Sequence, residues 1–189
     1  MEPLIEDDGR SAPQVAVRPA YESERPLIEG LFQFYAYDWS EMEPVGSAAL
    51  EVNAEGRFEP YPHLDEYWSA EDRWPLLIRT NERTVGFALI NTPSHRGGRV
   101  ERNMAEFFVA RKHRRRRVAA AAVQQILRAH PGSWEIAVAE RNATARAFWE
   151  TALAAAANLS DLHIVQGDGE HWRGPIWCFR AGSPDGPPG

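Results

Sequence analysis

An unbroken run of arginines, Arg114–Arg117, separates a hydrophobic segment from an alanine-rich one, and this placement suggests anion chemistry. The pattern of Met104–Val109 predicts a β-strand and that of Val118–His130 a helix, so the arginines fall in the connecting loop. The first N–H groups of a helix lack partners within it and attract phosphate. The sequence therefore predicts a site for a phosphate-bearing ligand. For Arg115 and Arg116 taken singly, a solvated surface is an equal alternative.

The loop departs from the usual chemistry of phosphate-binding turns at two positions. Such turns favour glycine, whereas this chain has Arg117 and Ala119. The side chain of Arg117 penalises a positive φ, but its guanidinium can pair with phosphate through two hydrogen bonds. The change can thus either alter the binding mode or abolish it, and both alternatives remain open.

Other catalytic chemistries have little support. The six histidines form no HExxH pair, and the chain has no Gly-x-Ser-x-Gly segment. Cys178 is the single cysteine, so it cannot form an intramolecular disulfide, and it has no metal-ligand partners at motif spacing. We therefore expect neither a metal site nor a serine hydrolase.

The composition predicts one soluble domain. A chain of 189 residues with 43% hydrophobic residues can bury a substantial core. The net charge of −6 argues against a generally basic nucleic-acid-binding surface, although the arginine cluster leaves local polyanion binding open. The N-terminal sequence MEPLIEDDGR lacks the features of a secretory signal, and no apolar run approaches membrane-spanning length. We expect a cytoplasmic protein with no membrane partner.

Around the arginine loop, the pattern predicts an ordered region at residues 14–181 between flexible tails at 1–13 and 182–189. The first expected strand is Val15–Arg18, followed by a helix that Ser23 caps. A polar stretch at Glu43–Arg57 and an irregular aromatic segment come next. The helix should use one face for the core: Leu27, Ile28, Leu31, Phe32 and Tyr35.

The later elements alternate between strands and helices. Leu76–Arg79 and Thr84–Ile90 predict an antiparallel hairpin with Asn81-Glu82 at its turn. The expected helix at Val118–His130 ends at Pro131-Gly132. One face of it is apolar: Val118, Ala122, Val123, Ile126 and Leu127. The remaining expected elements are a strand with Trp134, Ile136 and Val138 on one side, a helix from Asn142 to about Ala156, and strands near Leu162–Gln166 and Pro175–Phe179.

Two motifs on these elements resemble those of the GNAT superfamily of acyl-CoA-dependent N-acyltransferases. Arg114–Ala119 is similar to the family's Gln/Arg-x-x-Gly-x-Gly/Ala loop, and Asn142–Trp149 is similar to Asn-x-x-Ala-x-x-Phe-Tyr. The resemblance covers most of residues 14–181. The segments FYAYDWSE, YPHLDEYW, MAEFFVARK and WRGP are further similar to text in a group of small bacterial predicted acetyltransferases.

The resemblance implies an α/β fold with a mixed, mostly antiparallel seven-stranded sheet flanked by helices. It places acetyl-CoA between two central parallel strands, with the pyrophosphate on the altered loop. No metal is required. The coenzyme-contacting positions carried over from the family are Phe108, Val109, Arg114, Arg115, Arg116, Arg117, Val118, Ala119, Asn142 and Trp149.

The resemblance also implies direct attack of an amine on the thioester, without a covalent enzyme intermediate. Glu106 is then the candidate general base, and a structural hydrogen-bond acceptor is the equal alternative. Backbone N–H groups near Phe108–Val109 would polarise the thioester carbonyl if the strand has a bulge. Trp149 replaces a tyrosine that reprotonates the thiolate in many relatives, so it is either core or a cleft wall. Asn142 either contacts the coenzyme or caps a helix.

The acceptor is expected at the first helix and the aromatic segment, where carboxylates and rings suit a cationic amine. The candidate residues are Tyr35, Asp38, Glu41 and Tyr67. The principal hypothesis is an acetyltransferase that acts on a primary amine of a small molecule. Two alternatives are a transferase that takes its acyl group from an aminoacyl-tRNA and a non-catalytic binding protein with a closed coenzyme site. The sequence leaves a homodimer open.

Overall fold

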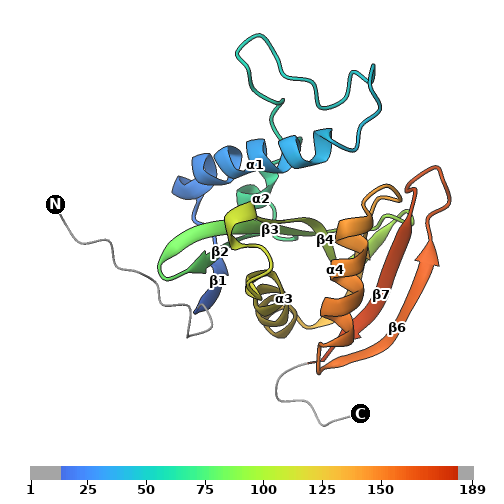
Figure 1. Cartoon of the computed structure of the whole chain (residues 1–189). Helices are drawn as coiled ribbons and strands as arrows, with labels where there is room; N and C mark the ends of the chain where they lie inside the picture. Colours follow the sequence, from blue (N-terminus) through green and yellow to red (C-terminus); the bar gives the residue numbers. More distant parts are fainter. Residues whose placement is uncertain (1–13, 183–189) are drawn as a thin grey trace.

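The protein is built on one twisted, seven-stranded sheet, seen in a computed structural model that describes residues 14–182 (Figure 1). The strand order is β1-β2-β3-β4-β5-β7-β6. Every neighbouring pair is antiparallel except β4 and β5, which are parallel. This confirms the mixed, mostly antiparallel sheet. The strands are β1 (Val15–Pro19), β2 (Trp74–Thr80), β3 (Arg83–Pro93), β4 (Arg99–Val109), β5 (Gly132–Ala137), β6 (Leu159–Gln166) and β7 (Pro175–Ala181).

Helices cover both faces of the sheet (Figure 1). The long helix α1 (Arg25–Ser40) crosses one face and buries Ile28 and Phe32 against β2, β3 and β4. The opposite face carries α3 (Val118–Ala129) and α4 (Ala143–Ala154). Burial of apolar side chains on both faces of β3 stabilises this three-layer arrangement.

The two helices on the lower face follow the expected pattern closely. All five apolar residues predicted for the buried face of α3 are buried: Val118, Ala122, Val123, Ile126 and Leu127. In α4 the Asn142 side chain accepts a hydrogen bond of 2.9 Å from the N–H of Ala145. Asn142 is therefore a helix cap, one of the two alternatives for this residue.

The start of α1 differs from expectation. Ser23 lies within a short 3-10 helix, η1 (Glu22–Glu24), and its hydroxyl does not cap α1. Instead the N–H of Tyr21 donates to the carboxylate of Glu24 at 3.0 Å, and Glu24 also pairs with Arg18. The N-cap position of α1 is Glu24, and no side chain among the described residues caps this helix.

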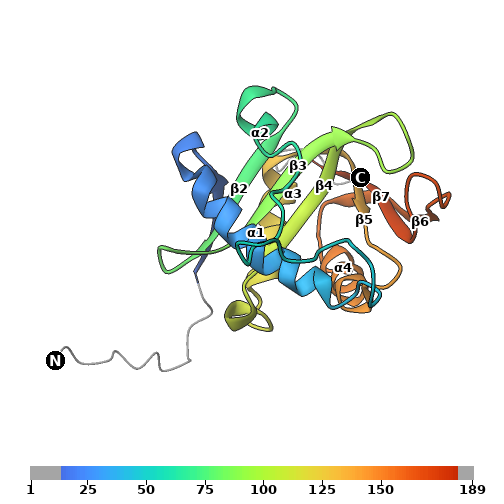
Figure 2. The ribbon, with the colours of Figure 1, turned by 90° about the horizontal axis from the view of Figure 1, so that it is seen from above.

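The segment between α1 and β2 loops over the outer side of α1 (Figure 2). It is irregular, as expected, apart from a single short helix, α2 (Glu66–Ser69). A second 3-10 turn, η2 (Arg111–His113), follows β4. Of the expected tails at 1–13 and 182–189, all residues except Gly182 lie outside the described residues. The described residues contain no helix long and apolar enough to cross a membrane.

Candidate active site

A bulge in β4 decides which way its side chains point. Leu89 pairs with Glu106 and Ile90 with Met104, so Ala105 is an extra residue with no opposite partner. Met104 therefore packs in the core beneath the sheet, whereas Glu106 faces α1 two residues later. Without the bulge, residues two apart would share a face.

The Glu106 carboxylate is enclosed by tyrosines. The hydroxyl of Tyr35 on α1 donates a hydrogen bond to its Oε2 atom. Burial raises the pKa of Glu106 to about 7, although the nearby hydroxyls of Tyr35 and Tyr61 act in the opposite direction. A carboxyl group with this pKa is divided between both protonation states near neutral pH, as general acid–base catalysis requires.

Tyr35 is held rigidly in this position. Its ring lies 5.6 to 6.1 Å from those of Phe32, Trp39, Phe87 and Phe108, mostly in edge-on arrangements. Burial raises the pKa of its hydroxyl well above the ordinary value, and the neighbouring Glu106 charge adds to the effect. Tyr35 therefore stays protonated and available as a donor.

Glu106 opens into a large cavity beneath α1, which we call the α1 pocket. Its volume is about 780 Å³, enough for a small organic substrate. The guanidinium of Arg141 bounds it, donating to the Met42 carbonyl at 2.7 Å and to Glu43 at 3.1 Å. The lining residues are Phe32, Tyr35, Ala36, Trp39, Pro44, Leu50, His95, Ala105, Glu106, Ala137, Ala139, Glu140, Arg141, Trp172 and Arg173.

A narrower cleft, the β4–β5 cleft, lies between the two parallel strands. The strands pair at Arg102–Trp134 and Asn103–Glu135, and beyond these pairs they separate around a volume of about 70 Å³. Tyr35, Trp39 and Ala105 are among the residues shared with the α1 pocket, so the two cavities meet beside Glu106. The cleft is lined by Tyr35, Trp39, Met104, Ala105, Phe107, Ile136, Ala137, Val138, Ala139, Asn142, Ala145 and Trp149.

Backbone N–H groups of β4 face this cleft. The N–H of Ala110 donates to Val85 on β3, and N–H directions alternate along a strand. The N–H groups of Phe107 and Val109 consequently point away from β3, while that of Phe108 points toward it. Of the two sequence-predicted donors, the geometry favours Val109, and it adds Phe107, which lines the cleft.

The arginine loop adopts glycine-like backbone angles despite its side chains. Arg115 has φ 59° and Arg117 has φ 62°, both in the left-handed region. Arg117 is the N-cap of α3, and its carbonyl accepts from the N–H of Ala121, so the N–H groups of Val118–Ala120 come before the first i→i−4 donor of the helix. The backbone thus retains the form of a phosphate-binding turn, and the residues present fit such a group.

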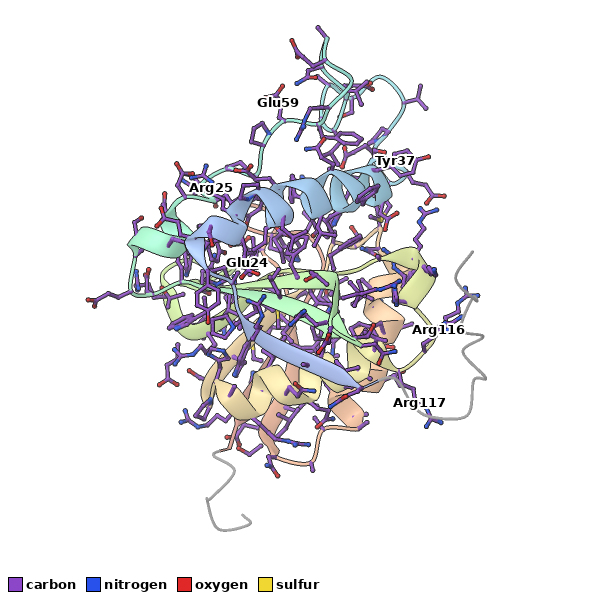
Figure 3. The ribbon with its side chains drawn as sticks, turned by 90° about the vertical axis from the view of Figure 1, so that its left-hand side faces the viewer. Glu24, Arg25, Tyr37, Glu59, Arg116 and Arg117 are labelled. Atoms are coloured by element: carbon purple, nitrogen blue, oxygen red, sulfur yellow. The ribbon has the colours of Figure 1, made fainter. Side chains whose placement is uncertain are left out.

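The arginines of the loop separate into two sets. Arg114 folds back: its Nε donates to the Val109 carbonyl at 2.7 Å, and its guanidinium pairs with Asp38. Arg115–Arg117 are exposed, and Figure 3 shows Arg116 and Arg117 projecting away from the body of the protein. The exposed side chains are placed to contact a ligand only at the mouth of the loop.

The predicted acceptor residues do not all meet. Asp38 pairs with Arg111 at 2.7 Å and with Arg114, so it braces the arginine loop. Glu41 is exposed at the end of α1, and Tyr67 is buried, where its hydroxyl accepts a hydrogen bond of 3.2 Å from Asn91. Among the four, Tyr35 alone both lines the α1 pocket and contacts Glu106.

Trp149 combines the two alternatives that the sequence left open. It is buried in the core and packs edge-on against Phe107 at 5.3 Å, and it also lines the β4–β5 cleft. Sequence reasoning missed one further wall, formed where His95 packs on Trp172 with ring centroids 4.6 Å apart. These two residues are distant in the chain, and no motif signals their contact.

Comparison with known families agrees with this geometry. The profile of the acetyltransferase (GNAT) family matches residues 31–154, which include the second half of α1, β4, the arginine loop and all of α4. A comparison with curated protein sequences found no match.

Solved structures share the fold at low sequence identity. An acetyltransferase from Thermus thermophilus has a TM-score of 0.59 and 13% identity, covering 89% of this chain and 97% of its own. PaiA N-acetyltransferase from Thermoplasma acidophilum, in complex with coenzyme A, has a TM-score of 0.55 and 9% identity, with 88% and 98% covered. Spermidine N-acetyltransferase from Vibrio cholerae, in complex with coenzyme A and spermine, has a TM-score of 0.52 and 12% identity, with 88% and 94% covered. Because the family profile spans most of the chain and the site geometry is consistent with it, this protein belongs to the GNAT acetyltransferase family.

Proposed function

We propose that this protein transfers an acetyl group, or another short acyl group, from coenzyme A to a primary amine of a small molecule. The observation that carries the proposal is the position of Glu106, a half-buried carboxylate that lines the α1 pocket beside its junction with the β4–β5 cleft. An amine in the pocket and a thioester in the cleft would meet beside it. Family membership supports this class of reaction.

The donor would use backbone groups more than arginine side chains. The N–H groups of Val118–Ala120 would hold the pyrophosphate, supported by the positive end of the α3 dipole. Arg115–Arg117 are exposed at the mouth of the loop, where their guanidinium groups would attract phosphate groups of the donor that lie outside the turn. The acyl-bearing arm would lie in the β4–β5 cleft beside Trp149.

The reaction would proceed by direct attack. Glu106 takes a proton from the acceptor ammonium, and the resulting amine attacks the thioester carbonyl. The oxyanion that forms is stabilised by the N–H of Phe107, which faces the cleft, with Val109 as the next donor along β4. The intermediate then collapses, with loss of the coenzyme A thiolate.

The carboxylates and rings of the pocket suit a cationic acceptor. Glu106 and Glu140 line the cavity. Of the two arginines that also line it, Arg141 is paired with Glu43, and Arg173 donates to the Gly169 carbonyl. The rings of Trp39 and Trp172 add aromatic walls suited to an alkylammonium group. We therefore assign a small primary amine or polyamine as the acceptor class.

The test is an assay of free coenzyme A released from acetyl-CoA, with spermidine, ethanolamine and a peptide with an N-terminal alanine as acceptors. We expect turnover with a small amine that falls about 100-fold or more in Glu106→Gln, since general-base catalysis contributes on this scale. Faster turnover with the peptide would contradict the small-molecule assignment. If the protein fails to bind acetyl-CoA and instead binds aminoacyl-tRNA tightly and in a salt-sensitive way, the acyl donor is the aminoacyl-tRNA.

A further inference from the structure

The proposed reaction has a second proton requirement besides the one that Glu106 meets. When the C–S bond breaks, the leaving thiolate must gain a proton in order to depart as a thiol. A group that supplies this proton must lie in the β4–β5 cleft, where the thioester would be, and must carry an acidic hydrogen. This inference therefore rests on the proposed function.

Few side chains that line the cleft have such a hydrogen. The indole N–H groups of Trp39 and Trp149 are donors but not acids at accessible pH. Asn142 is engaged as the cap of α4, and its amide is likewise not an acid. Apart from Tyr35, the other lining residues are alanine, valine, isoleucine, methionine and phenylalanine.

Tyr35 has the required contacts on both sides. It lines the α1 pocket and the β4–β5 cleft, and its hydroxyl is hydrogen-bonded to Glu106. Four neighbouring rings fix its orientation, and the hydrogen bond holds its hydroxyl at Glu106. Tyr61 and Tyr67, which are also near Glu106, line neither cavity.

The geometry points to Tyr35 as a catalytic proton carrier that links the general base to the leaving group. Glu106 first receives a proton from the acceptor ammonium. As the C–S bond breaks, the Tyr35 hydroxyl gives its hydrogen to the sulfur and takes the proton held by Glu106. The carboxylate is regenerated, and the second proton on nitrogen passes to water. The balanced products are the amide, coenzyme A thiol and one released proton.

The hydrogen bond between the two residues suits both directions of transfer. While Glu106 is ionised, the tyrosine donates to it; once Glu106 is protonated, the carboxyl group can donate to the phenol oxygen and free the phenol hydrogen for sulfur. Tyr35 alone is a poor acid, because burial raises its pKa well above 10. The net transfer is nevertheless favourable, since Glu106 with a pKa of about 7 loses a proton to an alkyl thiolate, a more basic group: the pKa of the cysteine thiol, for comparison, is about 8.5.

The test compares Tyr35→Phe with wild type for two acetyl donors, using the fastest amine of the acceptor panel. With acetyl-CoA we expect kcat to fall about 100-fold or more while the Kd for acetyl-CoA changes less than about twofold. S-phenyl thioacetate has a more acidic thiol, which leaves without proton assistance. With this donor, kcat/KM of Tyr35→Phe should be only a few-fold below that of wild type. If the role of Tyr35 is merely structural, the substitution should lower turnover with both donors by the same factor.

Tyr61→Phe is the matched control, because it removes the other phenol that affects Glu106 and leaves the cleft unchanged. It should affect the two donors alike. The solvent deuterium isotope effect on kcat with acetyl-CoA, which should decrease in Tyr35→Phe, provides a second measurement. Equal losses for the two donors, or an unchanged isotope effect, would overturn the inference while leaving the transferase intact. Wild-type protein that releases no coenzyme A with any amine would overturn the proposed function itself.

Discussion

The hydroxyl of Tyr35 on α1 donates a hydrogen bond to the carboxylate of Glu106 on β4, across 71 positions of sequence. This contact ties the helix that covers the α1 pocket to the strand that borders the β4–β5 cleft. It places one ionisable pair where the acceptor and the donor would meet.

The pH dependence of turnover should reflect Glu106. With acetyl-CoA and an accepted amine, kcat should rise with pH and level off above about 7, because only the ionised carboxylate accepts a proton. Glu106→Gln should lose this limb together with most of the activity. A wild-type profile that stays flat from pH 5 to 8 would remove Glu106 as the base.

The same carboxylate should reduce stability at high pH. The pKa of Glu106 is higher in the folded protein than in the unfolded chain. The contribution of Glu106 to stability is therefore fully present at pH values below its unfolded pKa, and it is lost as the pH rises through about 7. Glu106→Gln should thus be more stable than wild type at pH 8, by up to about 3 kcal/mol, with a smaller difference at pH 5. Urea denaturation at both pH values measures this. A constant difference would show that burial does not perturb Glu106.

Backbone strain at Arg117 should be measurable. An L-residue at φ 62° costs about 1 kcal/mol relative to glycine, so Arg117→Gly should raise the free energy of unfolding by roughly 0.5 to 1 kcal/mol. Arg116→Gly is the control, because Arg116 is not among the positive-φ residues, and it should lower stability instead. Equal effects of the two substitutions in thermal denaturation would mean that the turn is not strained.

Asp38 should compete with the ligand for the loop arginines. Asp38→Asn weakens the ion pairs to Arg111 and Arg114, at a stability cost of about 0.5 to 1 kcal/mol, since the arginines are largely exposed. The released guanidinium groups should strengthen acetyl-CoA binding, most clearly at low salt. Glu41→Gln, the same charge change at an exposed position of α1's end, should have little effect. Weaker binding by Asp38→Asn would instead make Asp38 a residue that positions the loop.

The amphipathic elements could be predicted from the sequence because their information is local. The apolar spacing in Val118–Leu127 determines the buried face of α3, and an asparagine before an alanine-rich run is sufficient to predict the cap of α4. Ser23 was predicted wrongly as the cap of α1, because it lies within a 3-10 turn whose Glu24 bonds the N–H of Tyr21 and pairs with Arg18 on β1. No local pattern includes that partner.

The candidate site was predictable in its parts but not in its connections. Glu106 and Tyr35 were both candidates, yet their contact depends on the bulge at Ala105, which turns Glu106 toward α1. Asp38 was expected to contact the acceptor, whereas it pairs with arginines that follow β4. Charge alone does not reveal a partner so distant in the sequence.

The central claim is that the arginine-substituted loop still holds an acyl-coenzyme A donor. Titration calorimetry of wild-type and Arg117→Gly protein with acetyl-CoA at low and moderate salt tests it most directly. We predict micromolar binding by wild type and binding at least as tight by Arg117→Gly, because both share the same backbone turn. Failure of both proteins to bind acetyl-CoA would contradict the account.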